Sequence, residues 1–174
     1  MKKYVLSLAI VSCLASTSAC AAACDAEAFI QNAGAAFMGA ARTGSSTAFT
    51  NAAVRYADLR GIALFALGPY RKNLPSSREG EYVALTKRFM GTFMAQYAGR
   101  FKGNSITITS CRGNIVGTKL SGGQSLTFRL RGNSRIEDVS VSGIWLAQTM
   151  RSKFTSVIGN HGGDVGALMK WLGG

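Results

Sequence analysis

Apolar side chains recur at helical spacing in six segments of the chain. These segments cover approximately residues 25–41, 47–54, 58–68, 76–100, 144–158 and 164–172. An apolar residue at every third or fourth position places these side chains on one face of a helix, and that face must be buried. We therefore expect about five or six helices, of which the segment 47–54 has the weakest pattern.

Local signals indicate where several of these helices begin and end. Ser76 and Glu79 match the Ser-x-x-Glu capping box and are predicted to begin the longest helix. Asp164 is a favourable N-cap for the last helix. Pro69 is predicted to end or kink the third helix, because proline lacks the backbone N–H that a helix needs.

The longest predicted helix carries an unusually aromatic stripe. Its members are Tyr82, Leu85, Phe89, Phe93 and Tyr97, flanked by Met90 and Met94. Core packing is the ordinary role of such a stripe. Aromatic side chains together with flexible methionines also suit a wall that must fit apolar ligands of variable shape.

In the C-terminal half the spacing of apolar residues changes from helical to alternating. Four such runs lie at residues 106–109, 115–120, 126–131 and 136–142, with Gly- and Asn-containing turns between them. Consecutive strands joined by short turns form an antiparallel meander. Leu126, Phe128 and Leu130 share one face of the third strand, and helices should cover that face. Gly143 is then predicted to break the chain before a helix that begins at Ile144.

The pattern as a whole predicts the α+β class. We expect a four-stranded twisted antiparallel sheet wrapped by about five or six helices. No internal repeat, linker or low-complexity tract interrupts the sequence.

The N-terminus has the features of a secretory signal peptide. Lys2 and Lys3 precede an uncharged apolar run over residues 4–14, and Ala21-Ala22-Ala23 form an A-x-A cleavage site. The apolar run is too short to span a bilayer. We therefore predict a signal peptide at residues 1–23 and export of the remainder. Its removal leaves about 150 residues, which is the size of one ordinary domain, so residues 24–174 are predicted to form a single domain.

Two cysteines remain after this cleavage, Cys24 and Cys111. In an oxidising compartment they form a disulfide or stay as two free thiols, and the sequence leaves both alternatives open. A lipid-modified cysteine is a less favoured alternative. Ala21 is a poor match to the aliphatic residue that such a signal prefers before Cys24, and Cys13 lies very early in the chain.

The charge of the chain favours anionic partners. The formal net charge is +12, and the Lys and Arg residues are scattered through the sequence instead of forming a tail. Lipid headgroups and nucleic acid are the main candidates, whereas a basic surface that only maintains solubility is the alternative. Nucleic-acid binding would require aromatic residues among the basic ones, and here the aromatics lie on the apolar stripes.

The sequence offers little for catalysis or metal binding. His161 is the sole histidine and lies in a glycine-rich segment. In a serine hydrolase it would have to be the only base, and no G-x-S-x-G motif is present to supply the nucleophile. The chain contains only eight acidic residues, and no P-loop or G-x-G-x-x-G motif. We predict no enzymatic activity, no catalytic residue and no metal site.

Several segments together resemble one known family. They are residues 58–71, 82–101, 136–146, 151–154 and 162–168, in this order and spacing. They resemble the MlaC (toluene-tolerance) family of periplasmic lipid-binding proteins, which are auxiliary components of ABC transporters, and the Asn160-His161-Gly162-Gly163 segment is most similar to the hopanoid-biosynthesis-associated branch. Trp145, where a small residue is usual, Pro69 and a short strand segment at 111–124 depart from the family pattern.

The resemblance implies a function in lipid transport. Family members carry lipid through the periplasm between an outer-membrane lipoprotein complex and an inner-membrane transporter that contains an MCE-type protein. The resemblance therefore implies a phospholipid or hopanoid-type lipid as ligand and no other cofactor. We also expect no nucleic-acid partner and a monomer. The alternative is a basic exported module that binds anionic membrane surfaces without extracting lipid.

A carrier of this kind needs an enclosed apolar site. Each methylene moved from a membrane into water costs about 0.8 kcal/mol, or on the order of 12 kcal/mol for a chain of about 16 carbons. We predict that the acyl chains contact Ile62, Phe89, Phe93, Tyr97, Leu126, Phe128, Leu130, Leu146 and Met150, with the headgroup near a mouth lined by basic residues. For each of these residues ordinary core packing is the alternative, because a lipid pocket and a core share composition.

Overall fold

The computed structural model describes residues 24–101 and 103–174, and the predicted signal peptide at 1–23 lies outside this part of the chain. The α-helices are α1 (Glu27–Thr43), α2 (Ser46–Tyr56), α3 (Leu59–Ala66), α4 (Glu79–Gln96), α5 (Leu146–Gly159) and α6 (Val165–Gly173). The short 3₁₀ helices are η1 (Gly68–Asn73), η2 (Ser76–Arg78) and η3 (Ala98–Arg100). The strands are β1 (Ile106–Arg112), β2 (Ile115–Leu120), β3 (Ser125–Arg131), β4 (Arg135–Val141) and β5 (Ile144–Trp145).

The predicted α+β class is confirmed, but the predicted numbers of strands and of helical segments were too low. Within the described residues the sheet has five strands instead of four, and short 3₁₀ helices add to the α-helices that the pattern predicted. The strands follow one another in the order β1-β2-β3-β4-β5, and every neighbouring pair is antiparallel. The predicted meander is therefore present. Register shifts in the β1–β2 and β3–β4 pairs add local bends to the sheet.

The fifth strand arises from a tight turn that was predicted to be a simple break. Ser142 and Gly143 both have positive φ, 51° and 90°, as a two-residue hairpin turn of type I′ requires. The chain therefore reverses, and Ile144 pairs with Val141 while Trp145 pairs with Ser140. The prediction that the helix begins at Ile144 was wrong, because Ile144 is in β5 with 64 % of its surface exposed and α5 begins at Leu146.

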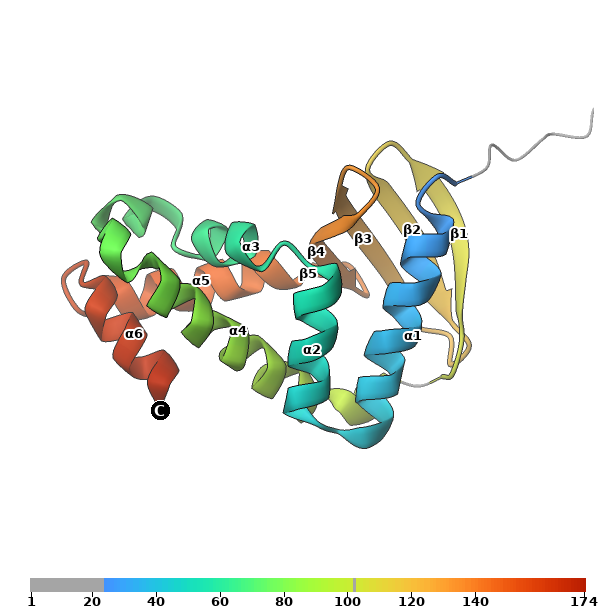
Figure 1. Cartoon of the computed structure of the whole chain (residues 1–174), viewed down its shortest axis with the longest axis horizontal. Helices are drawn as coiled ribbons and strands as arrows, with labels where there is room; N and C mark the ends of the chain where they lie inside the picture. The colour runs from blue at the N-terminus through green and yellow to red at the C-terminus, as the bar shows by residue number, and fades with distance from the viewer. Residues whose placement is uncertain (1–23, 102) are drawn as a thin grey trace, which may run out of the picture.

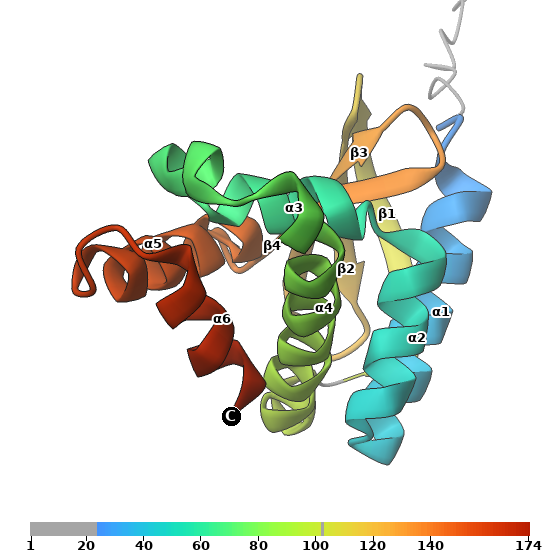
Figure 2. The ribbon, with the colours of Figure 1, turned by 60° about the vertical axis from the view of Figure 1, so that its left-hand side comes forward.

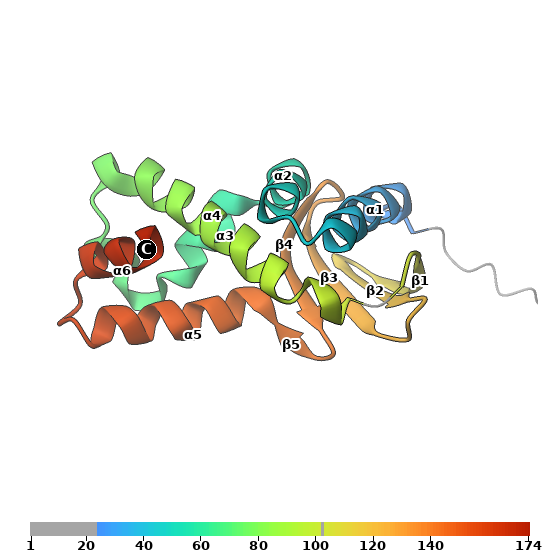
Figure 3. The ribbon, with the colours of Figure 1, turned by 90° about the horizontal axis from the view of Figure 1, so that it is seen from below.

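The helices are arranged in two groups around the sheet. The antiparallel pair α1 and α2 covers one face, and α3, α5 and α6 extend beyond the edge formed by β4 and β5 (Figure 1). α4 runs between these two groups (Figures 2 and 3). α3 is fixed to the sheet at its start, where the Asp58 N–H donates to the Ile136 carbonyl at 2.8 Å.

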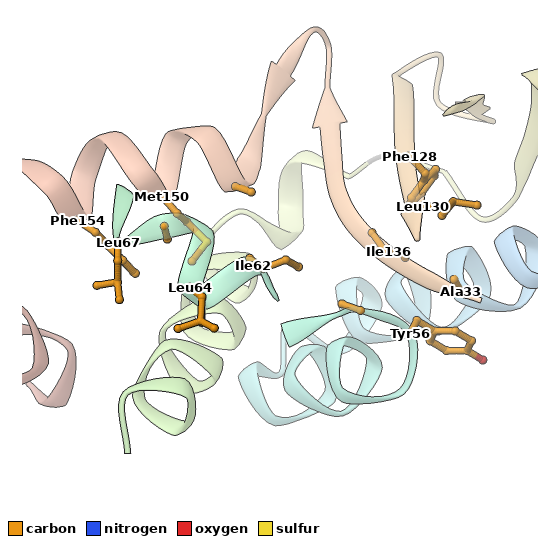
Figure 4. Close-up of a cluster of buried hydrophobic side chains, with 14 of the residues drawn as sticks. Ala33, Tyr56, Ile62, Leu64, Leu67, Phe128, Leu130, Ile136, Met150 and Phe154 are labelled. Carbon is orange, nitrogen blue, oxygen red and sulfur yellow. The ribbon is translucent and has the colours of Figure 1, made fainter. Parts of the chain in front are cut away.

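A continuous buried cluster joins the two groups. In Figure 4 Phe128, Leu130 and Ile136 come from the sheet, while Ile62, Met150 and Phe154 come from α3 and α5. Tyr82 of α4 is fully buried in this cluster and donates its hydroxyl hydrogen to the Ala63 carbonyl at 2.7 Å. The predicted apolar faces therefore meet in one core. No helix of residues 24–101 or 103–174 is both long enough and apolar enough to cross a bilayer.

The predicted helix starts are confirmed at Asp164 but not at Ser76. The Asp164 carboxylate accepts from the Gly166 N–H at 2.7 Å and caps α6. Ser76 instead begins the 3₁₀ helix η2, and α4 begins at Glu79 with Arg78 as N-cap and no side-chain capping bond. The capping-box prediction was wrong because η2 occupies the turn in which Ser76 would act as a cap.

Gly91 allows α4 to approach α2, and we expect Gly91→Ala to lower the free energy of unfolding by about 1–3 kcal/mol. A Cβ at position 91 would lie 2.7 Å from the Ser46 carbonyl oxygen, a backbone atom that cannot rotate away, and would also collide with the Thr50 side chain. This clash outweighs the gain of about 1 kcal/mol that alanine has over glycine in a helix. Urea denaturation measures the change.

Gly80 of the same helix is the matched control. No described atom lies within 4 Å of a Cβ at this position. We expect Gly80→Ala to be neutral or stabilising by up to about 1 kcal/mol. Equal destabilisation of both variants would contradict the close helix packing at Gly91.

Candidate functional site

An apolar cavity of about 110 Å³ lies between the sheet and the helices. The α1 and α2 helices, with the residue that follows α2, supply Gly34, Phe37, Met38, Ala41, Phe49, Ala53 and Ala57. The sheet and the segment before it supply Phe101, Ile106, Leu120, Leu126, Phe128, Ile136, Asp138, Val139 and Val141. The remaining helices supply Ile62, Met90, Met94, Leu146, Ala147 and Met150. We call this space the inner cavity.

A second apolar space opens at the surface between α4, α5 and α6. Its volume is about 320 Å³, and it is lined by Phe89, Met90, Phe93, Met94, Leu146, Thr149, Met150, Lys153 and Trp171. We call it the outer groove. The Phe89 ring centroid lies 5.4 Å from both the Phe154 and the Trp171 ring centroids, so aromatic packing fixes this end of the groove.

The structure brings together most of the predicted ligand residues, in two places. Five of them, Ile62, Leu126, Phe128, Leu146 and Met150, line the inner cavity. The aromatic stripe of α4 faces the outer groove instead, through Phe89 and Phe93. The flanking Met90 and Met94 are the α4 residues that reach the inner cavity.

Two of the predicted ligand residues line neither the inner cavity nor the outer groove in the part of the chain that the structure describes. Leu130 is buried in the core near the end of β3. The Tyr97 ring packs against the Phe93 ring at a centroid distance of 4.8 Å, beyond the groove. Trp145, which departs from the family pattern, also lines neither space and lies under the Arg129 guanidinium at 4.4 Å from the ring centroid.

The sequence interpretation missed the small residues of α1 and α2. Gly34, Ala41, Ala53 and Ala57 line the inner cavity because they leave space, not because they fill it. Patterns of large apolar side chains do not reveal such positions. The signal that could have found them is the row of small residues on the buried side of two Ala-rich helices.

A polar cleft of about 160 Å³ adjoins the inner cavity through Ile62, Asp138 and Ala147. Its charged residues are Asp58, Arg129, Arg131, Glu137 and Asp138. Arg131 pairs with both Asp58 and Glu137, each at 2.7 Å. The cleft therefore contains three carboxyl groups and two guanidinium groups, so its acidic groups outnumber its basic ones.

Asp138 joins β4 to the start of α5. Its Oδ1 accepts hydrogen bonds from the Val139 and Ala147 N–H groups, each at 2.8 Å. Trp145 is the N-cap residue of α5, but its side chain makes no capping hydrogen bond. Asp138 supplies this cap from the sheet. Burial raises the pKa of the Asp138 carboxyl above its ordinary 3.8, although the hydrogen bonds from Ala147 and Val139 and the charge of Arg129 act against this rise.

The raised pKa of Asp138 predicts a specific pH dependence of stability. Between 3.8 and the raised folded-state pKa, the folded protein holds a proton that the unfolded chain has already lost, so stability falls as pH rises through this window. Urea denaturation at several pH values should show that the native protein gains stability relative to Asp138→Asn as pH falls through the window. A difference that does not change with pH would contradict the assignment.

The hydrogen bonds of Asp138 predict a separate loss in Asp138→Ala. This variant leaves two backbone N–H groups at the start of α5 without their acceptor, and we expect it to lose on the order of 2 kcal/mol at neutral pH. Asp138→Asn is the control, because its amide oxygen can still accept both bonds.

The described residues, 24–101 and 103–174, contain no group of three His, Cys, Asp or Glu side chains placed to hold a metal ion. His161 Nδ1 lies 2.8 Å from the Val157 carbonyl oxygen at the exposed end of α5. The site described above can therefore enclose apolar groups.

Comparison with known proteins finds a similar fold and a matching family. A structural match is the phospholipid-binding protein from Ralstonia solanacearum, solved in complex with a phospholipid. The two chains are 18 % identical, the match covers 85 % of this chain and 94 % of that one, and the TM-score is 0.64. A comparison with curated proteins finds no match. The family described as MlaC protein matches residues 33–173, and this chain therefore belongs to the MlaC family.

Proposed function

We propose that this chain is a periplasmic lipid carrier that encloses acyl chains between its sheet and its helices. The observation that carries the proposal is the inner cavity, which has apolar walls contributed by the sheet and by five of the α-helices. Membership of the MlaC family and the phospholipid bound to a protein of the same fold support it. The predicted signal peptide supports export.

The size of the inner cavity indicates that its walls must move when lipid binds. An apolar cavity of about 150 Å³ accommodates benzene, and the inner cavity measures about 110 Å³. An acyl chain of about 16 carbons needs on the order of 12 kcal/mol of replacement burial, which a space of this size does not supply. The outer groove, at about 320 Å³, provides further apolar volume next to it.

We propose a contact role for seven of the predicted ligand residues. Ile62, Leu126, Phe128, Leu146 and Met150 would surround the acyl chain in the inner cavity, and Phe89 and Phe93 would contact it in the outer groove. Leu130 and Tyr97 would support these walls by packing from behind.

The proposed carrier consists of residues 24–174 as one monomeric domain. It would move a phospholipid or a hopanoid-type lipid between an outer-membrane lipoprotein complex and an inner-membrane ABC transporter that contains an MCE-type protein. This part of the proposal rests on the family to which the chain belongs.

Mass spectrometry of the gently purified mature protein tests the proposal. We expect lipid to copurify, to be extractable with solvent, and to move from the protein to acceptor vesicles. Protein that contains no lipid and takes none from vesicles would overturn the carrier function.

The net charge of +12 favours one alternative, a basic module that binds anionic membranes without extracting lipid. Such a module should sediment with phosphatidylglycerol vesicles at low salt and dissociate at high salt, because screening weakens exposed charge interactions. A carrier should instead leave the vesicles with lipid bound. Sedimentation followed by lipid analysis of the supernatant protein separates the two functions.

A further inference from the structure

Two surface spaces share wall residues with the inner cavity, and they differ in chemistry. The polar cleft meets it at Ile62, Asp138 and Ala147. The outer groove shares four wall residues with it, and these are Met90, Met94, Leu146 and Met150. Each of these spaces is a candidate route for a lipid into the inner cavity.

The polar cleft is a poor route for a phospholipid. An acyl chain would have to cross three carboxyl and two guanidinium groups, which lose hydration when apolar groups approach them. Its Arg131 is already paired with Asp58 and Glu137, and its three carboxyl groups outnumber its two guanidinium groups, which disfavours a phosphate. Asp138 also ties β4 to α5 at this boundary and resists its opening.

The wall between the outer groove and the inner cavity consists mainly of side chains that change conformation easily. Three of its four residues are methionines, which have three rotatable bonds and tolerate many packing arrangements. Met90 and Met94 lie one turn apart on α4, and Met150 of α5 lines the same two spaces. A change of methionine rotamers would join the two spaces without breaking a hydrogen bond.

The rim of the outer groove carries the residue types that meet a membrane surface. The Trp171 side chain is 41 % exposed while its ring packs on Phe89, so the indole is held in place at the surface. The Lys153 ammonium lies 5.5 Å from the Trp171 ring centroid. Tryptophan and lysine are favoured where apolar chains meet headgroups.

We propose that phospholipid acyl chains enter and leave the inner cavity through the outer groove, past the methionine wall, while Lys153 receives the lipid phosphate at the rim. The phospholipid is the occupant that fits, because the groove is apolar along its floor and cationic at its edge. This inference rests on the proposed carrier function and adds the route and the phosphate contact.

Thr149→Trp tests the route, because Thr149 is exposed and lines the outer groove. The probe is a vesicle of phosphatidylcholine and phosphatidylglycerol that carries a phospholipid with a fluorescent acyl chain. We expect the variant to take up the fluorescent lipid about tenfold more slowly, which corresponds to about 1.4 kcal/mol in the barrier. Gln148→Trp, at an exposed neighbouring position outside the groove lining, is the control and should load at the wild-type rate.

Lys153→Glu tests the phosphate contact with little risk to folding, since Lys153 is exposed. We expect uptake from the same vesicles to slow several-fold. Lys170→Glu on α6 changes the net charge equally but lies outside the groove lining, and it should have a smaller effect. Equal slowing by both substitutions would overturn a specific role for Lys153.

The outcomes separate this inference from the carrier function. Uptake by Thr149→Trp at the wild-type rate would overturn the groove as a route. If the wild-type protein takes up no fluorescent lipid and contains none after purification, the carrier function itself fails. Thermal unfolding of each variant confirms that it is folded before the kinetics are compared.

Discussion

Replacement of both Cys24 and Cys111 by serine is expected to lower the free energy of unfolding by about 4 kcal/mol. The two cysteines form a disulfide with a Cα–Cα distance of 5.8 Å and a sequence separation of 87 residues. A cross-link over so long a segment removes many conformations from the unfolded chain, and its loss restores them. For a domain of about 150 residues the melting temperature should fall by roughly 10 °C.

The measurement is urea denaturation of the oxidised protein, the reduced protein and the serine variants. Cys24→Ser and Cys111→Ser alone should match the double variant, because either substitution removes the same bridge. A wild-type protein whose stability is unchanged by reduction would contradict the role assigned to the bridge.

The disulfide also decides between alternatives that the sequence left open. Cys24 precedes α1 and Cys111 lies in β1, so the bridge ties the first helix to the edge of the sheet. A sulfur atom in a disulfide cannot also carry a lipid through a thioether. The bridge therefore argues against a lipid-modified Cys24 and favours an oxidising compartment, as the predicted export requires.

The strand pattern was the most reliable part of the sequence interpretation. Leu126, Phe128 and Leu130 alternate with polar residues, and the structure turns all three toward the helices. The strand that the sequence interpretation missed, β5, depends on Ser142 and Gly143. Their positive φ values form a hairpin where the sequence predicted only a break in the chain. A Ser-Gly pair between apolar runs is a weak turn signal, which explains the omission.

The face of α4 that meets the sheet could not be predicted from spacing. Phe89 and Met90 are neighbours in sequence and both are apolar, yet Phe89 lines the outer groove while Met90 lines both spaces. A helix between two groups of elements has two apolar faces, and periodicity alone does not show which partner each face meets. Only the tertiary arrangement identifies the methionines as the wall.

Asp138 could not have been identified as a cap from the sequence. Side-chain caps are recognised a few residues before the helix they serve. Here the capping carboxylate lies in β4 and reaches the Ala147 N–H, nine residues later, because the β4–β5 hairpin folds back on itself. The same hairpin brings Leu146 into the wall of both apolar spaces.

The second large effect is expected in the inner cavity itself, where Ala53→Phe should reduce bound lipid about tenfold, or by about 1.4 kcal/mol. Ala53 lies on α2, is 5 % exposed and lines the cavity. A phenyl ring is similar in size to benzene, which occupies an apolar cavity of about 150 Å³, so it should fill a space of about 110 Å³.

Ala53→Phe separates a lipid site from an ordinary packing defect, because lipid content and stability should respond differently. Filling an apolar cavity supplies packing contacts, although a ring larger than the space strains its walls, so the variant should lose no more than about 1–3 kcal/mol of its free energy of unfolding. Val54→Phe is the matched control, since Val54 is the next residue of α2 and is 50 % exposed. Lipid extraction with mass spectrometry, together with urea denaturation, measures both quantities. An Ala53→Phe protein that stays folded and keeps its full lipid content would place the acyl chain outside the inner cavity.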